Sequence, residues 1–336
     1  MKIIKTTAPT RIDLAGGTID LPPLYLFHYP APTINIAIDI RTSTIIRPSK
    51  KFEVVSRDQR LNAVWDKLPD APWKKYPRLE LILRLLKSFK PEKPVRLETN
   101  SQAPAGSGLG GSSSLAITLT HALSKWRGYS FSKEELIEYA KSVETQTIKV
   151  PTGYQDYWAA VYGGINAYEM GLDGTLKRTP LGSPAFHQEL ERHRVLVYAG
   201  QPRFSGTNNW ELFKRHIDSD IKTVNFFEKI KENALLMKKA LESEKINNVA
   251  NALNQDWKTR KSMLPKMTTP IIEKLMKEMF RGGALAARVC GAGGGGCVLF
   301  LAEPDKRTKL IKQIKKMNMS VLPAKISKNG VTIKKT

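Results

Sequence analysis

Residues 104–114 read Pro-Ala-Gly-Ser-Gly-Leu-Gly-Gly-Ser-Ser-Ser and lie between an expected strand, 95–98, and an expected helix, 112–126. Glycines let backbone N–H groups turn toward a ligand, and the N-terminus of the following helix adds a partial positive charge. The segment is therefore typical of a phosphate-binding loop. It is not a Walker A sequence, because no Gly-Lys-Ser/Thr ends it, and it lacks the full dinucleotide-binding pattern. A glycine-rich structural turn is the other interpretation that this stretch alone allows.

Two further glycine-rich segments lie on either side of this loop in the sequence. Residues 8–23 place Arg11, Asp13 and Asp20 around a Gly-Gly pair, and charged groups beside an apolar turn need a partner, either one another or a polar ligand. Residues 291–296 read Gly-Ala-Gly-Gly-Gly-Gly, which predicts close backbone approach either to a phosphate or to a neighbouring chain segment. Three such loops together are harder to explain as structural turns than any one alone.

Hydrophobic periodicity predicts a chain that mixes strands and helices. Expected strands are 34–46, 95–98, 165–169, 195–198 and a segment directly after the last glycine loop. Expected helices are 112–126, one that begins after a Ser132–Glu135 capping box, 157–162, several within 209–263, 270–280 and a basic amphipathic one around Leu310 to Met317. The pattern changes at 180–200, so we expect two domains, residues 1–185 and a helix-rich part at 186–336.

Composition limits the class of protein. The chain has 336 residues, 41% hydrophobic and 25% charged, which suits a buried core and excludes a mainly disordered, collagen-like or coiled-coil protein. No apolar run approaches the roughly 18 to 20 residues of a membrane span, and the first residues lack the apolar stretch of a signal peptide, so a cytoplasmic location is expected. Cys290 and Cys297 are too few for a disulfide framework and are expected to pack as small side chains, and five scattered histidines predict no zinc site.

The chain is strongly basic, with a formal net charge of +23. Such an excess favours nucleic acid, acidic membrane surfaces or phosphorylated small molecules as partners, and composition does not choose among them. Residues 303–336 hold ten Lys or Arg against two acidic residues. We interpret this basic run as a solvated face, and it also motivates the nucleic-acid alternative considered below.

Taken in order, the three segments resemble the motifs of the galactokinase, homoserine kinase, mevalonate kinase and phosphomevalonate kinase (GHMP) superfamily. Within it the sequence is most similar to the branch of D-glycero-D-manno-heptose 7-phosphate kinase and fucose kinase. This similarity rests on four stretches: Leu-Ala-Gly-Gly at 14–17, Gly-Tyr-Gln-Asp at 153–156, Trp257-x-x-Arg260, and the glycine segment 291–296. The resemblance implies an α+β, two-lobed fold: an N-terminal, ribosomal-protein-S5-like β/α lobe that binds ATP, and a helix-rich C-terminal lobe with an antiparallel sheet.

The resemblance also implies roles for individual residues. ATP would contact Pro104, Gly106, Ser107, Gly108, Leu109, Gly110, Gly111, Ser112 and Ser113. Ser112 and Glu144 match the family's magnesium ligands, and magnesium prefers such oxygen groups. Asp156 matches the catalytic aspartate that accepts the proton of the attacking hydroxyl, and Arg11 matches the cation beside it. Asp20, Gly17, Thr18, Gly153, Gly293 and Gly294 are expected on the acceptor side, with Ser205 and Thr207 as further candidates.

Simpler interpretations stay open for these carboxylates. Asp156 could be a surface residue that favours a helix dipole, and Glu144 could be an exposed carboxylate on a solvated helix face. Two departures from the family pattern also matter. Gly111 replaces the first serine of the common Gly-Leu-Gly-Ser-Ser, which removes one phosphate-facing hydroxyl, and Thr18-Ile19 stand where smaller or hydroxylic residues are usual. The second departure leaves the identity of the sugar open.

The function implied is an ATP- and magnesium-dependent kinase that phosphorylates a hydroxyl, expected to be anomeric, of a sugar or sugar phosphate. One alternative is an isoprenoid kinase with a mevalonate-type acceptor. Another is a nucleic-acid-binding protein on a kinase scaffold, motivated by the charge of +23. The retained motifs and the absence of an aromatic-plus-basic recognition sequence argue against the last, so we expect a small-molecule partner, no membrane and no nucleic acid.

Overall fold

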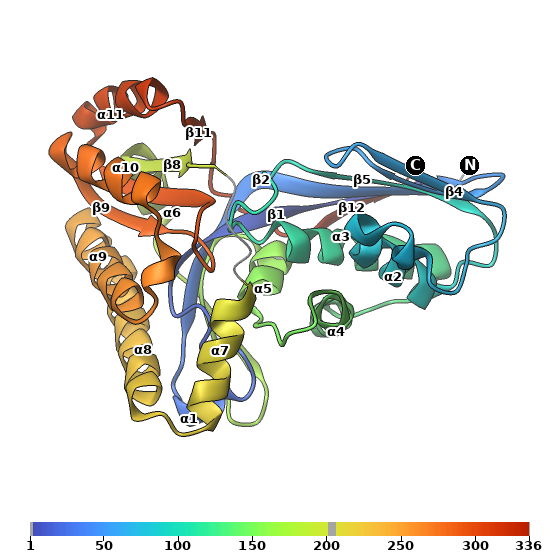
Figure 1. Ribbon diagram of the computed structural model, residues 1–336, viewed down its shortest axis with the longest axis horizontal. Coiled ribbons are helices and arrows are strands. Elements are labelled where there is room, and N and C mark those ends of the chain that lie inside the picture. Colours follow the sequence, from blue (N-terminus) through green and yellow to red (C-terminus); the bar gives the residue numbers. More distant parts are fainter. Residues whose placement is uncertain (1–2, 201–205, 336) are drawn as a thin grey trace.

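Two β-sheets organise the computed structural model, which describes residues 3–200 and 206–335 (Figure 1). The larger sheet has eight strands, in the order β12-β1-β2-β5-β3-β4, with β6 and β7 attached to β2. Its strands are β1 (Ile4–Ala15), β2 (Thr33–Pro48), β3 (Phe52–Ser56), β4 (Leu61–Trp65), β5 (Val95–Ser101), β6 (Ile165–Met170), β7 (Leu176–Pro180) and β12 (Thr332–Lys335). Only the β3–β5 pair among these is parallel.

The smaller sheet is antiparallel, as expected for the C-terminal part of the chain. Its order is β11 (Ser320–Leu322), β8 (Arg194–Tyr198), β10 (Cys297–Ala302) and β9 (Ala284–Val289). The fully buried strand β10 lies between two neighbours, and this explains its continuous apolar sequence.

Helices cover the sheets in two groups (Figure 1). Beneath the larger sheet lie α2 (Glu80–Phe89), α3 (Gly111–Arg127), α4 (Lys133–Ile148) and α5 (Gln155–Tyr162). The other helices are α1 (Leu24–Phe27), α6 (Pro184–His193), α7 (Gly206–Ile217), α8 (Ile221–Glu242), α9 (Ile246–Met263), α10 (Pro270–Arg281) and α11 (Pro304–Lys316). Short 3-10 turns occupy Pro72–Lys74, Pro77–Leu79 and Pro265–Met267. No helix in the described ranges is long and apolar enough to cross a membrane.

The local signals in the sequence correspond to real helix ends. Ser132 caps α4 by accepting from the backbone N–H of Glu135, whose side chain accepts in turn from the N–H of Ser132. Gly128 ends α3 in the left-handed conformation. The expected α+β fold with two lobes is confirmed.

Strand β1 connects the two lobes. It pairs with β2 along most of its length, and every residue from Ala8 to Ala15 is buried. Its second half packs against α8 and against the smaller sheet, where Ile12 and Leu14 join a core with Met237 and Leu299. This strand was not among the elements expected from the sequence, although it carries Arg11 and Asp13.

The end of the chain returns to the larger sheet. Residues 323–331, called the return segment below, run from β11 to β12, and β12 pairs with β1. Lys325 O accepts from the N–H of Asp39 (2.8 Å), and Ser327 donates its N–H to Ala37 O (2.8 Å). The last residues of the region 186–336 therefore belong to a sheet that is otherwise built from the first 180 residues, and the expected domain limits stay a prediction.

The return segment fits tightly against α5 at Gly330. A Cβ atom built there would lie 2.0 Å from the carbonyl oxygen of Val161. We expect Gly330→Ala to lower the free energy of unfolding by about 1–3 kcal/mol, because the added methyl group forces the backbone at residue 330 or at Val161 to move. Urea unfolding measures this change. Asn329→Ala, at the exposed neighbouring position, is the control and should stay within about 0.5 kcal/mol of the parent; an equal effect of both would contradict the steric explanation.

Candidate active site

The glycine-rich loop lies between β5 and α3 and forms the wall of a cavity of about 650 Å³. All nine residues expected to contact ATP line this cavity: Pro104, Gly106, Ser107, Gly108, Leu109, Gly110, Gly111, Ser112 and Ser113. Gly110 precedes α3 with φ of 71°, a conformation that favours glycine. A Cβ atom there would also lie 3.0 Å from Cγ of Asp156, so glycine lets the loop approach that side chain closely. The first residues of α3 line the cavity, and the backbone N–H groups of a helix's first turn lack partners within the helix, which suits phosphate binding.

Glu144 and Ser112 lie on the wall of the same cavity. Glu144 is 3% exposed, so it is not a carboxylate on a solvated helix face. The Tyr157 hydroxyl donates to its Oε2 (2.6 Å). Burial raises the pKa of Glu144, and hydrogen bonds from Ser112, Tyr157 and Ser113 offset only part of that rise.

A buried carboxylate beside a hydroxyl and a phosphate-binding loop fits a magnesium ion that completes its shell with phosphate oxygens and water. No group of three or more His, Cys, Asp or Glu able to hold a metal occurs within residues 3–200 and 206–335. The protein would therefore supply only part of the shell. This is usual for magnesium in nucleotide sites, where the ion keeps several waters.

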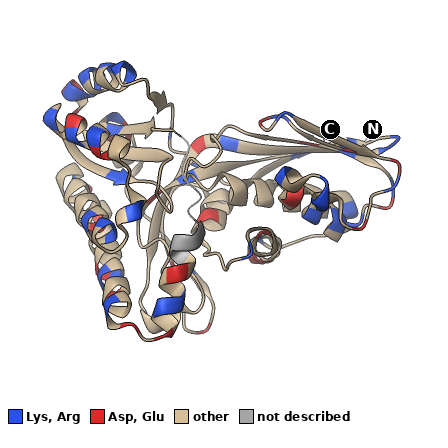
Figure 2. Cartoon of the chain, in the orientation of Figure 1, with Lys and Arg blue, Asp and Glu red and all other residues tan. Residues whose placement is uncertain are grey.

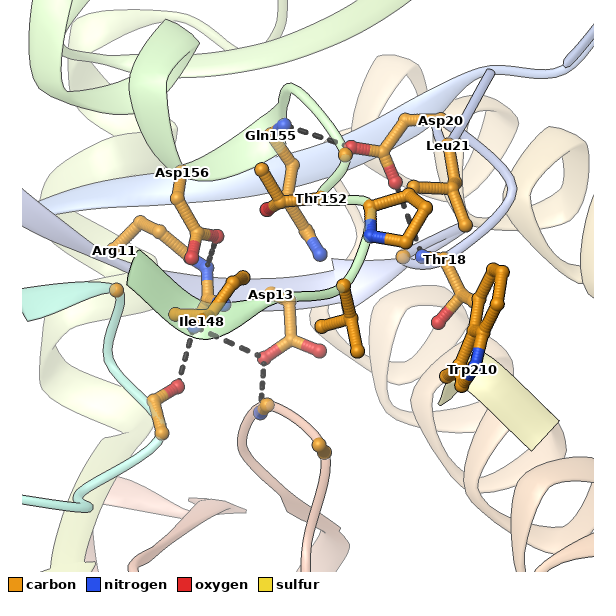
Figure 3. A pocket seen from close by; sticks show the side chains of 18 of the residues that line it. Arg11, Asp13, Thr18, Asp20, Leu21, Ile148, Thr152, Gln155, Asp156 and Trp210 are labelled. Carbon is orange, nitrogen blue, oxygen red and sulfur yellow. Dashed lines mark hydrogen bonds and ion pairs between the residues drawn. The ribbon is translucent and has the colours of Figure 1, made fainter. Parts of the chain in front are cut away.

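Figure 3 shows a second cavity, of about 280 Å³, which shares lining residues with the first. It is called the acceptor cavity below, after the acceptor-side residues expected there. Four of the six residues expected on the acceptor side line it, namely Asp20, Gly17, Thr18 and Gly153. Arg11, expected beside the catalytic aspartate, lines it as well. The wall also includes Gln155, Trp210 and Arg260, so it presents both polar and apolar groups. Asp156 lines both cavities and so stands at their junction.

Asp156 is held by Arg11. Asp156 is the second residue of α5, and its Oδ1 accepts from Nε of Arg11 at 2.7 Å. Arg11 also donates from Nη1 to Gly108 O in the glycine loop, and its Nη1 lies 3.7 Å from Asp13. Burial alone would lower the pKa of Arg11, but the attraction of Asp156 and Asp13 outweighs it and the pKa rises. A permanently charged guanidinium therefore touches both the carboxylate and the loop.

Asp20 fixes the first glycine turn against α5. Its Oδ2 accepts from the backbone N–H groups of Tyr154 (2.6 Å) and Gln155 (2.8 Å), and its Oδ1 accepts from Thr18 (3.0 Å). Burial raises the pKa of Asp20 despite these bonds. Its carboxylate lines the acceptor cavity while holding the N-terminus of α5, so contact with a substrate hydroxyl stays a prediction.

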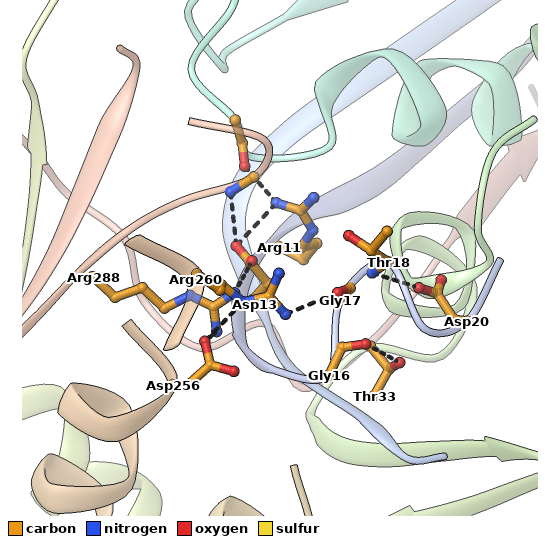
Figure 4. A network of polar contacts seen from close by, with 12 residues as sticks. Arg11, Asp13, Gly16, Gly17, Thr18, Asp20, Thr33, Asp256, Arg260 and Arg288 are labelled. Carbon is orange, nitrogen blue, oxygen red and sulfur yellow. Dashed lines mark hydrogen bonds and ion pairs between the residues drawn. The ribbon is translucent and has the colours of Figure 1, made fainter. Parts of the chain in front are cut away.

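A chain of buried charges starts from the wall of the acceptor cavity, which Asp13 and Arg260 line (Figure 4). Asp13 Oδ2 lies 2.5 Å from Nη2 of Arg288, and Asp13 Oδ1 accepts from the N–H of Gly291 (3.0 Å). Arg288 Nη1 lies 3.0 Å from Oδ2 of Asp256, which also binds Nε of Arg260 (2.9 Å). Arg260 in turn donates to the carbonyl oxygen of Gly17 (2.8 Å).

This chain joins β1, β9 and α9 to two of the glycine segments. Burial raises the pKa of Asp13, but Arg288 and Arg11 outweigh it and hold the pKa below its ordinary value. The structural Arg–Asp pairing that the sequence left open is therefore present. Sequence reasoning assigned no role to Asp256, Arg260 or Arg288. Only Arg260 had a signal, as the last residue of Trp257-x-x-Arg260.

Some expected site residues lie elsewhere or are not described. Gly293 and Gly294 line neither cavity: a Cβ at Gly293 would collide with Met267, whose carbonyl oxygen accepts from the N–H of Gly294 (2.9 Å). Their contact is with a neighbouring chain segment, and Gly291 of the same loop reaches the acceptor cavity instead. Ser205 and the side chain of Thr207 lie outside the described residues. Cys290 and Cys297 are buried and unpaired.

Removing the central cation tests the buried chain. We expect Arg288→Met to lower the free energy of unfolding by about 3–5 kcal/mol, because Asp13 and Asp256 would keep buried charge with less compensation. Urea unfolding at neutral pH measures the loss. Arg281→Met is the matched control, since that side chain is 63% exposed and pairs with Glu278 at the surface. A loss below about 1 kcal/mol in Arg288→Met would contradict the importance of this chain.

Comparison with known proteins agrees with this geometry. The GHMP kinases N terminal domain model matches residues 79–164, and the GHMP kinases C terminal model matches 237–318. The chain is 28% identical to a D-glycero-alpha-D-manno-heptose 7-phosphate kinase of Campylobacter jejuni, over 98% of each chain. It is 26% identical to a mevalonate kinase of Pyrococcus furiosus, over 99% of this chain and 98% of the relative.

The fold has a solved counterpart. A D-glycero-D-manno-heptose 1-phosphate kinase from Bacteroides thetaiotaomicron superposes with a TM-score of 0.80, at 22% identity and covering 99% of each chain. The two family models together span both lobes, and the first includes the glycine loop, Glu144 and Asp156. This chain belongs to the GHMP kinase superfamily of small-molecule kinases.

Proposed function

We propose that this protein transfers the γ-phosphoryl group of ATP, with magnesium, to a hydroxyl of a sugar or sugar phosphate of the heptose 7-phosphate kind, at the anomeric position. The observation that carries the proposal is the place of Asp156. It lies in the wall of the cavity that contains the phosphate-binding loop and also in the wall of the smaller cavity beside it. A base at such a junction can reach an alcohol in one cavity while the phosphoryl donor lies in the other.

The groups around the junction suit phosphoryl transfer, which depends mainly on positioning and charge neutralisation. Asp156 would accept the proton of the attacking hydroxyl, and Arg11 would hold its carboxylate in place. The backbone N–H groups of 106–112 would hold phosphate oxygens. Ser112 and Glu144 would hold magnesium, which neutralises charge on the phosphates when it is bound.

The acceptor cavity supports a sugar. Its volume of about 280 Å³ lies at the small end of ligand pockets, which range over roughly 300–1,000 Å³. Thr18, Gln155 and Asp20 present polar groups, while Trp210 presents a flat apolar surface, a combination that suits the polar edges and apolar face of one sugar ring. The heptose 7-phosphate kinase of Campylobacter jejuni, similar over nearly its whole length, supports the same acceptor class.

An acceptor screen tests the proposal directly. ADP release in a coupled assay would be measured with D-glycero-D-manno-heptose 7-phosphate, fucose, galactose and mevalonate. We expect the heptose phosphate to give the highest kcat/KM. Turnover with mevalonate alone would show that the isoprenoid alternative is right and the sugar proposal wrong. Binding of generic DNA with steep salt dependence, and no ADP release with any acceptor, would favour the nucleic-acid alternative.

Asp156→Asn removes the proposed base while keeping the shape of the side chain. We expect kcat with the best acceptor to fall on the order of 10²–10⁴-fold, because the amide cannot take the hydroxyl proton. Nucleotide affinity, measured by calorimetry, should change little. Asp66→Asn, at a side chain that is 83% exposed and pairs only with Lys51 at the surface, serves as control. Near-normal turnover in Asp156→Asn would remove this residue from the mechanism.

Glu144→Gln separates stability from metal binding. The pKa of Glu144 is higher in the folded protein than in the unfolded chain. Between these two pKa values the folded protein keeps a proton that the unfolded chain has released. The free energy of unfolding therefore falls as the pH rises from the ordinary carboxyl range toward the folded pKa. The glutamine variant lacks this loss, so we expect it to be more stable than the parent near pH 8 and to differ less near pH 4.

The same substitution should weaken magnesium-dependent nucleotide binding at least tenfold, because a charged oxygen ligand is lost. Thermal unfolding across pH and calorimetric titration with magnesium and ADP measure the two effects. Glu242→Gln, on the exposed surface of α8, should alter neither. A variant that is less stable at pH 8 but binds nucleotide normally would contradict both assignments.

A further inference from the structure

A third cavity, of about 360 Å³, lies between α6, β8, β11, α11 and the start of the return segment. It shares no lining residue with the two cavities of the active site. Figure 2 shows that basic residues outnumber acidic ones along α11, which forms one side of this cavity. The proposed kinase function gives this cavity no role.

Arg194, the first residue of β8, lines the cavity and is only 4% exposed. Its Nη2 donates to the carbonyl oxygen of Ala324, but its Nη1 is buried and has no hydrogen-bond partner. A buried donor without a partner is destabilising. Burial, with repulsion from Arg307, lowers the pKa of Arg194 to about 10 although Glu191 attracts it, so the group remains charged at neutral pH.

The other charges of the cavity leave it positive. Arg307 and Lys325 line it together with Arg194, against one carboxylate, Glu191. That carboxylate is already engaged, because its Oε1 accepts from the backbone N–H of Ile326 (2.5 Å). Arg307 is tied to the same strand through a hydrogen bond from its Nε to Arg194 O (3.2 Å).

The rest of the wall is apolar. Leu196, Val321, Leu322 and Pro323 line this part of the cavity. Guanidinium groups bind carboxylates and phosphates through paired N–H donors. An anion with a short apolar part would balance the charge of these cations and would cover the apolar part of the wall.

We propose that this cavity is a binding site for a small organic oxyanion, a carboxylate or a phosphate ester, whose charged end contacts Arg194, Arg307 and Lys325. The site would also join separate parts of the chain. Lys325 belongs to the return segment that bonds to β2. Directly after β8, the N–H of Ala199 donates to the carbonyl oxygen of Gly296 (2.9 Å), at the end of the glycine segment 291–296. Bound anion would therefore stabilise the junction of the two sheets.

Ligand-dependent thermal unfolding of the full chain tests the site. The probes are inorganic phosphate, glycerol 3-phosphate and butyrate, each compared with sodium chloride at equal ionic strength. We expect glycerol 3-phosphate or butyrate to raise Tm in a saturable way, since a ligand that binds only the folded state stabilises it. The ratio of the two dissociation constants shows whether the site prefers a phosphate ester or a carboxylate.

Charge-removing variants locate the binding. Arg307→Gln/Lys325→Gln should weaken binding of the better probe about tenfold or more, the loss of one or more charge-assisted contacts. Lys309→Gln/Lys312→Gln removes two charges from the exposed face of α11 and should bind as the parent does. Because Arg307 also holds the backbone of β8, Lys325→Gln alone, at an exposed position, is measured as well and should show a partial loss.

Three results would overturn the proposal: no shift beyond that of sodium chloride with any probe, a shift only with inorganic phosphate, or equal binding by the Arg307→Gln/Lys325→Gln variant and the α11 control. Inorganic phosphate alone could bind at the glycine-rich loop, whereas butyrate has little affinity for such a loop. The measurement needs no turnover, so its failure and a failure of the proposed kinase activity are distinguishable.

Discussion

The ion pair between Arg11 and Asp156 is the constraint on which the site depends. Arg11 lies on a strand that is buried along its second half, and its guanidinium is only 4% exposed. A buried guanidinium is stable only if its N–H groups and charge are matched. The matching groups come from three separate elements, namely Asp156 on α5, Gly108 O in the loop and Asp13 on the same strand. The contacts that Arg11 needs therefore hold the glycine-rich loop and the Asp156 carboxylate next to each other.

Asp13 extends this constraint into the second lobe. Its partner Arg288 is fully buried on β9 and also pairs with Asp256 on α9, next to Arg260. Buried ion pairs contribute little net stability, because desolvation offsets the attraction, but breaking one is strongly destabilising. The main effect of such a chain of charges is to hold β1, β9 and α9 in place relative to one another. Its contacts hold the glycine turn at Gly17 and the loop at Gly291, which line the same cavity.

Patterns within a few neighbouring residues predicted those parts of the fold that depend mainly on neighbouring residues, such as loops and helix ends. The glycine loop and the capping box at Ser132 both have the expected structure. Strand β1 was missed because residues 8–15 are buried on both faces, which removes the period-two alternation of a half-exposed strand. The pairing of β12 with β1 was also missed, since contacts across more than 300 residues leave no local pattern.

The same distinction holds for the site. Residues in compact motifs, such as Asp156 and Glu144, lie on the expected cavities, whereas Asp256 and Arg288 depend on partners far along the chain. A glycine run also does not show which of its members meets a ligand. Gly291 reaches the acceptor cavity, but Gly293 packs on Met267. Lys and Arg occur on elements of both lobes (Figure 2), and a net charge of +23 attracts anions from a distance set by ionic screening. Short-range recognition must then come from backbone N–H groups and buried arginines, because the glycine loop contains no lysine.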